Sequence, residues 1–111
     1  MARISTHVLD IAKGMPGGGI GVELYNQGQL ISSAMTNADG RTDAPLLDGA
    51  CVPAGSYELI FQVDDYLLRT HPSEPLFLDR ITIRFAVVSE NRNYHVPLLL
   101  APHGYSTYRG S

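Results

Sequence analysis

Two histidines stand in strand-like stretches of otherwise apolar sequence. His7 shares its side with Leu9 and Ile11 under a period of two, and His95 stands near the start of the most apolar stretch of the chain. Imidazole is the side chain that most readily takes or gives a proton near neutral pH. A single histidine in a strand is usually structural, with satisfied hydrogen bonds. Two of them on different strands favour a shared site for acid–base chemistry.

The last residues of the chain are a second candidate for chemistry. Chain ends are normally polar and frayed, whereas here Tyr105, Tyr108 and Arg109 come just before Gly110 and Ser111. One interpretation is an edge strand that ends in solvent. The other is that the terminus belongs to a site, to which Ser111 gives its hydroxyl or its terminal carboxylate.

The remaining motifs favour no metal and no nucleotide. The four histidines include no pair at metal-ligand spacing such as i, i+2 or i, i+4. The glycine-rich segment 14–21 lacks the Gly-Lys-Ser/Thr ending of a phosphate loop, so we interpret it as a turn. Cys51 is the single cysteine, which excludes an internal disulfide. We interpret Cys51 as a small buried hydrophobic residue rather than a reactive thiol.

Length and composition set further bounds. The 111 residues fit one domain, 1–111, with a single core. Charged residues make up 17% of the chain, below the roughly 25% of a typical soluble domain, which favours an oligomer. The net charge of -3 offers no basic excess for nucleic acid. No stretch is long and apolar enough for a membrane span or a secretion signal, so we expect a cytoplasmic protein.

Alternation of apolar and polar residues dominates the sequence and predicts strands to position these groups. The predicted strands are 20–26, 57–63, 81–88 and 94–100, with shorter candidates at 6–12, 30–36 and 46–52. Turn signals separate them, among them the tight hairpin Asn26-Gln27-Gly28. Many short strands at near-regular spacing predict an antiparallel sandwich or barrel. Segment 64–70 is predicted as the one short helix, ending before His71-Pro72.

Several segments match a known pattern in order and spacing. They are Ser5-Thr6-His7-Val8-Leu9-Asp10, Thr36-Asn37-Ala38-Asp39-Gly40-Arg41, Tyr94-His95-Val96-Pro97-Leu98-Leu99-Leu100, and Gly104-Tyr105-Ser106-Thr107-Tyr108-Arg109-Gly110-Ser111. Together they resemble the 5-hydroxyisourate hydrolases over nearly the whole chain. The terminal tetrapeptide is the most specific part, because it separates these hydrolases from transthyretin, the hormone carrier of the same fold.

The resemblance implies an all-β fold, a transthyretin-like antiparallel β-sandwich of about eight strands with one short helix. It implies a homotetramer with active sites in the channel between dimers. It also implies hydrolysis of a small molecule, 5-hydroxyisourate, which urate oxidation produces, without a metal or an organic cofactor. The implied catalytic residues are His7, Arg41, His95 and Ser111, and the implied substrate-binding residues are Tyr108, Arg109 and Gly110. Departures from the family pattern, such as His103 in place of an aromatic residue, touch none of these positions.

Within this interpretation the general base is His7 or His95, assisted by the other. Arg41 and Arg109 are expected near both histidines, where their charges keep one imidazole neutral and suit an oxyanion. The main alternative is a non-catalytic carrier of a small aromatic ligand on the same sandwich. A carrier is expected to lack His7, Arg41 or the terminal motif, and all are present. A second alternative is a general interaction domain, which explains the strands but not the histidine pair or the terminus.

Overall fold

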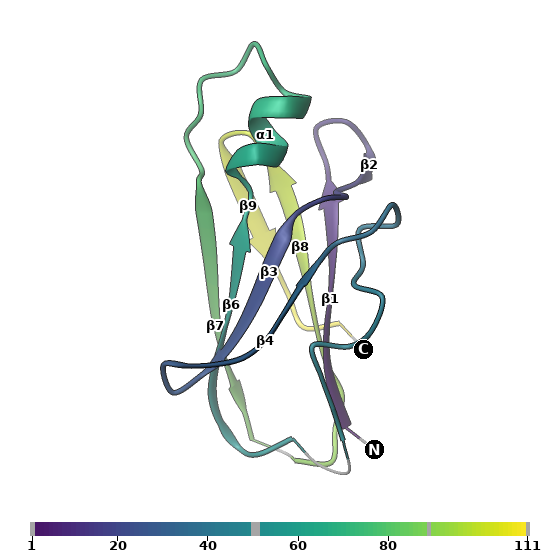
Figure 1. Ribbon diagram of the computed structural model, residues 1–111, viewed down its shortest axis with the longest axis vertical. Helices are drawn as coiled ribbons and strands as arrows, with labels where there is room; N and C mark the ends of the chain where they lie inside the picture. The colour runs from purple at the N-terminus through teal and green to yellow at the C-terminus, as the bar shows by residue number, and fades with distance from the viewer. Residues whose placement is uncertain (1, 50–51, 89, 111) are drawn as a thin grey trace.

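The computed structural model describes residues 2–49, 52–88 and 90–110. In this part, nine strands form two sheets, and the helix α1 (Asp64–Thr70) lies at one end of the sandwich (Figure 1). No helix of the described residues is long and apolar enough to cross a membrane. In chain order the strands are β1 (Ala2–Asp10), β2 (Met15–Pro16), β3 (Gly21–Asn26), β4 (Gln29–Met35), β5 (Leu47–Gly49), β6 (Gly55–Gln62), β7 (Arg80–Val87), β8 (Tyr94–Ala101) and β9 (Gly104–Thr107).

One strand pair in the first sheet is parallel, unlike every other described pair in the two sheets. The first sheet has the order β2-β1-β8-β9, with β5 also paired to β1, and the second sheet has the order β4-β3-β6-β7. All pairs are antiparallel except β1 and β8, which run parallel from Ile4 beside Tyr94 to Asp10 beside Leu100. The predicted β-sandwich with one short helix is confirmed, and in the described part of the chain it has nine strands where about eight were expected. The parallel pair was not predicted, because alternation reports the face of a residue and not the neighbouring strand.

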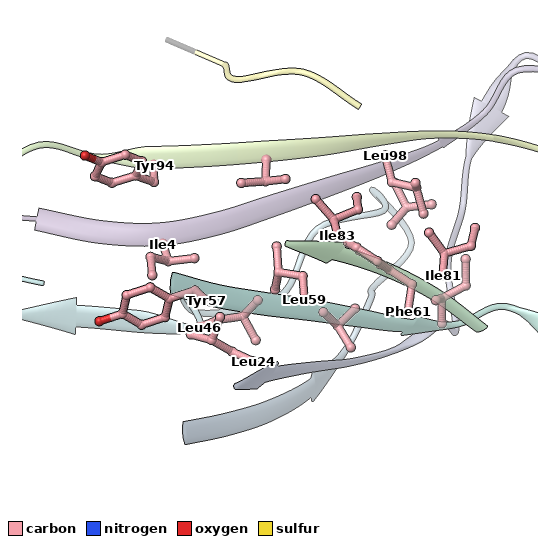
Figure 2. Close-up of a cluster of buried hydrophobic side chains, with 14 of the residues drawn as sticks. Ile4, Leu24, Leu46, Tyr57, Leu59, Phe61, Ile81, Ile83, Tyr94 and Leu98 are labelled. Carbon is pink, nitrogen blue, oxygen red and sulfur yellow. The ribbon is translucent and has the colours of Figure 1, made fainter. Parts of the chain in front are cut away.

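The core lies between the two sheets (Figure 2). On β8, Tyr94, Val96, Leu98 and Leu100 are buried, as the alternation predicts. They face apolar side chains of the other sheet, among them Phe61. Burying each large apolar side chain stabilises the fold by about 1.5–3 kcal/mol. The same alternation turns the intervening residues of β8 to the outer face of the sheet.

The predicted strand at the start of the chain needs a correction. β1 begins at Ala2 rather than at residue 6, and its buried residues alternate from there. Ser5, His7 and Leu9 therefore point away from the core. Ile11, which the sequence grouped with His7, follows β1 in a turn and is 57% exposed. The stripe that contains His7 is an outer surface of the sandwich, not an inner one.

The short helix and the tight hairpin lie where the sequence predicts them. α1 ends at Thr70 with its C-cap at His71, directly before Pro72. Between β3 and β4, Gln27 and Gly28 both have positive φ, 52° and 78°. Two such residues form the turn whose twist matches that of antiparallel strands. The sequence did not predict β2, which lies in the glycine-rich segment, whereas β9 agrees with the interpretation of the terminal residues as an edge strand.

A buried carboxylate joins α1 to the end of β1. Asp10 is 1% exposed, and its Oδ2 accepts hydrogen bonds from Tyr66 Oη at 2.7 Å and from His71 Nε2 at 2.9 Å. Its Oδ1 accepts from the backbone N–H groups of Ala12 and Lys13. Burial acts to raise the pKa of Asp10, but the hydrogen bonds, that of His71 foremost, leave this pKa lowered. Burial and then Asp10 raise the pKa of Tyr66 to about 12.

Candidate active site

Both candidate histidines lie on the outer face of the first sheet. The parallel register places Ser5 of β1 beside His95 of β8, and His7 beside Pro97. His7 and His95 are therefore diagonal neighbours on adjacent strands, and both side chains are partly buried. The sequence could not show this pairing, because the two histidines are 88 positions apart. It arises because the inward residues of both strands are packed into the same core.

The loop 37–41 brings Arg41 to the same face. An isolated bridge pairs Arg41 with His7, and the backbone N–H of Val8 donates to Gly40 O at 2.8 Å. Asn37 fixes the loop, since its Oδ1 accepts from the backbone N–H groups of Asp39 and Arg41. Gly40 has φ of 77°, and a Cβ there would stand 2.3 Å from the oxygen of Val8. Glycine is therefore required at this approach of the loop to β1.

The hydrogen bond of His7 defines which of its nitrogens carries a proton. Its Nε2 lies 2.8 Å from the backbone oxygen of Asp39. A carbonyl oxygen only accepts hydrogen bonds, so Nε2–H must be the donor. In the neutral ring the proton acceptor is therefore Nδ1. His7 can therefore accept a proton or relay one only through Nδ1.

The surroundings of His95 lower the pKa of its ring. Burial lowers the pKa of His95 first, and the nearby charges of Arg41 and His7 lower it further. The neutral ring is the form that can accept a proton from water near neutral pH. Arg41 is thus the cation that adds to the effect of burial on the pKa of His95.

Gly110 packs directly against His95. Its backbone N–H donates to His95 O at 2.7 Å, which pairs the end of the described chain with β8. A Cβ at Gly110 would stand 2.6 Å from His95 Cδ2, so only glycine allows this approach without a shift. The predicted involvement of the terminal segment agrees with this contact. Ser111, like Cys51, lies outside the described residues.

The side chain of Arg109 contacts Tyr94 and Asn93, which directly precede His95 in the chain. Its guanidinium stands 4.6 Å from the centre of the Tyr94 ring and donates to Asn93 O at 3.1 Å. Tyr94 faces the core side of β8, whereas His95 faces outward. Of the two arginines, only Arg41 contributes to the field that lowers the pKa of His95. The attraction between Arg109 and the tyrosine ring accounts for this placement.

Two clefts are lined by residues that contact the histidines. One of about 200 Å³ opens beside Ser5 and Arg41, with Arg3 and Asp43 also on its wall. Another of about 450 Å³ lies beside Gly110, between Arg92 and Arg109. Tyr108, which is 57% exposed, lines a third, largely apolar cleft at the open edge of the sandwich.

The other two histidines lie elsewhere. His71 contacts Asp10 under the helix, and His103 Nε2 lies 2.9 Å from Glu74 on the surface. Among the residues that the structure describes, no three His, Cys, Asp or Glu side chains gather as a metal site would require. Sequence reasoning missed Ser5, which lies on the same face as His7. Its spacing of two from His7 was the signal that could have found it.

Together, fold and site define a class of protein: a transthyretin-like sandwich with two histidines and an arginine on one outer face. The sequence model of the HIUase/Transthyretin family matches residues 4–110, and the chain belongs to this family. The 5-hydroxyisourate hydrolase of Pseudomonas aeruginosa is 48% identical over 117 residues, covering 100% of this chain and 93% of its own.

Solved structures agree with this assignment. The 5-hydroxyisourate hydrolase of Klebsiella pneumoniae superposes with a TM-score of 0.85 at 37% identity, covering 100% of both chains. Sea bream transthyretin, solved in complex with thyroxine, also gives a TM-score of 0.85, but at 26% identity, covering 97% of this chain and 94% of its own. The fold is common to both proteins, while the sequence is more similar to the hydrolases.

Proposed function

We propose that this chain is a 5-hydroxyisourate hydrolase, which opens the lactam ring of 5-hydroxyisourate in urate degradation. The observation that carries the proposal is that His7 pairs with Arg41 on the same outer face as His95, whose pKa is lowered. A carrier needs neither a proton acceptor nor a cation placed for an oxyanion. The greater identity to a named hydrolase than to transthyretin also disfavours the carrier. Residues 1–111 act in this proposal as a single domain.

The reaction can be written with side chains and water alone. The water oxygen bonds to the lactam carbonyl carbon, its proton passes to a histidine nitrogen, and the carbonyl π electrons move onto the oxygen. When the C=O bond re-forms, the C–N bond breaks and the nitrogen takes the proton from the histidine. The new carboxylic acid then ionises. His95 suits the proton acceptor because its ring is neutral, and Arg41 suits the oxyanion because its charge is close by.

The terminal segment supplies the remaining proposed contacts. Gly110 lies against His95, so the hydroxyl of the next residue, Ser111, is proposed to orient the substrate or the water. Arg109 and Gly110 border the cleft of about 450 Å³, where a guanidinium fork can meet a flat ring with several carbonyls. Tyr108 is proposed to pack on the substrate ring. Ser111→Ala is expected to lower turnover without lowering the melting temperature.

A homotetramer is proposed as the assembled form. β7 and β9 are edge strands, and unpaired edges are ready to pair with a second copy. Between them opens a cleft of about 340 Å³ lined by Ile83, Phe85, Tyr94 and Val96, among others. The outer face with Leu9 and Leu99 supplies a second surface, and two different surfaces can build four copies. Light scattering after gel filtration should give four times 12.1 kDa; a monomer would contradict the assembly.

The activity is tested with substrate made fresh from urate by an oxidase. We expect the purified, untagged protein to remove the ultraviolet absorbance of 5-hydroxyisourate much faster than its spontaneous decay. His95→Asn should reduce turnover by about 100-fold or more with little change in melting temperature. His103→Asn is the matched control, because that side chain is 56% exposed and pairs with Glu74. If a folded protein gives no acceleration, the hydrolase proposal is wrong.

A further inference from the structure

Ser5 and His95 make a side-chain contact that the proposed reaction does not yet use. The two residues are direct neighbours across the parallel pair β1 and β8. Ser5 Oγ lies 2.9 Å from His95 Nδ1, within hydrogen-bond distance. Both side chains are partly buried, and Ser5 also lines the cleft of about 200 Å³ beside Arg41. This serine therefore touches both the ring of His95 and the space next to it.

The ring of His95 is held along two of its edges. Ser5 occupies the Nδ1 edge. Gly110 lies close to the Cγ–Cδ2 side of the ring, since a Cβ there would stand 2.6 Å from Cδ2 and 3.2 Å from Cγ. What remains is the edge that carries Nε2, for which the described residues give no hydrogen-bond partner. A substrate or water would therefore meet His95 through Nε2.

The direction of the Ser5 hydrogen bond decides what Nε2 can do. A neutral imidazole has one N–H and one bare nitrogen, and a hydroxyl can either accept or donate. If Nδ1–H donates to Ser5 Oγ, Nε2 is bare and accepts a proton. If the hydroxyl donates to Nδ1, Nε2–H can only donate. Only the first arrangement suits the base of a hydrolysis.

We infer that Ser5 is a positioning residue that holds the Nδ1–H form of His95, so that Nε2 accepts the proton of the attacking water. This inference rests on the proposed hydrolase function. As the lactam C–N bond breaks, the same Nε2 returns that proton to the leaving nitrogen. His7 is fixed in the opposite form, since its Nε2–H donates to Asp39 O and its Nδ1 is bare. The two histidines thus offer different nitrogens to the same face.

The position of the proton can be measured without any substrate. Protein labelled with ¹⁵N in histidine, at a pH where His95 is neutral, should show a protonated Nδ1 and a bare Nε2 at His95. The signals are assigned from their loss in His95→Asn. A protonated Nε2 with a bare Nδ1 in the unmodified protein would overturn the inference. Because this measurement reports no turnover, its failure leaves the hydrolase proposal standing, and failure of hydrolysis does not change the spectrum.

Kinetic measurements on Ser5 variants test the same inference. Ser5→Ala should lower kcat at least about tenfold, as part of the roughly 10²–10⁴ that positioned proton transfer contributes, and should change KM little. It should also shift the ¹⁵N pattern of His95 towards the Nε2–H form. Ser5→Thr keeps the hydroxyl and should restore both readouts.

Ser33→Ala is the matched control for these variants. Ser33 is exposed on β4 in the other sheet, and its replacement should leave kcat and the His95 spectrum unchanged. Full turnover in Ser5→Ala, with the His95 spectrum also unchanged, would overturn the inference. A loss of turnover in Ser5→Ala that persists in Ser5→Thr would also overturn the inference, provided that Ser5→Thr melts at the same temperature as the unmodified protein.

Discussion

Gly110 lies against the imidazole of His95 so closely that a Cβ would stand 2.6 Å from Cδ2. Gly110→Ala should therefore push the ring away from Ser5 and lower kcat by about tenfold or more, while the melting temperature changes by only a few degrees. Gly104→Ala is the control, because a Cβ there would meet nothing within 4 Å. Equal kcat values for the two alanine variants would show that the ring position is not critical.

The pH dependence of turnover should reflect the pKa of His95. Burial first, then Arg41 and His7, lower this pKa below 6.5. The neutral ring is the active form, so kcat/KM should be constant near neutral pH and fall as the pH drops through the lowered pKa. The acid midpoint of kcat/KM measured against pH is expected below 6.5. A midpoint above that value would assign the essential base to another group.

The effect of Arg41 on the pKa of His95 should be measurable in the titration of His95. Arg41→Gln removes a charge that lowers this pKa, so the pKa of His95 should rise, whereas Arg41→Lys should keep it low. Proton NMR of the imidazole ring measures the effect directly, even where the variant is inactive. An unchanged titration in Arg41→Gln would mean that burial alone sets the pKa.

Asp10 should stabilise the fold rather than the reaction. Asp10→Asn removes a buried charge that accepts from Tyr66 and His71, and should lower the free energy of unfolding by about 3 kcal/mol. The exposed Asp48 is the control, because Asp48→Asn should change this free energy by less than about 0.5 kcal/mol. Thermal or urea unfolding at neutral pH measures both. A loss of turnover without a loss of stability would place Asp10 in the reaction instead.

The carboxylate of Asp10 should also make the stability of the fold depend on pH. The pKa of Asp10 is lowered in the folded chain relative to 3.8. Its contribution is therefore fully present above pH 3.8 and is lost as the pH falls through the lowered folded value. Melting temperatures of the unmodified protein should fall across this range. Those of Asp10→Asn should fall less steeply there, and equal slopes would contradict this assignment.

Alternation along single strands predicted much of the fold, because it is a local property. The inward set of β8 and the span of α1 agree with the structure because each depends on neighbours only a few residues away. The prediction for β1 was less accurate, since Ile11 beyond its end extended the apparent apolar stripe across a turn. The strand β2 has only two residues, too short a stretch to show any period.

The sequence by itself determined which groups are available: two histidines on strands, an arginine in a loop and a terminal segment that ends in Gly110 and Ser111. Only the tertiary structure decided which of them meet. The parallel pairing of β1 with β8 places Ser5 beside His95, and the packing of the segment after β9 places Arg109 on Tyr94. The physical reason is that strand pairing and side-chain packing join residues about 90 positions apart, and no local pattern encodes that partner choice.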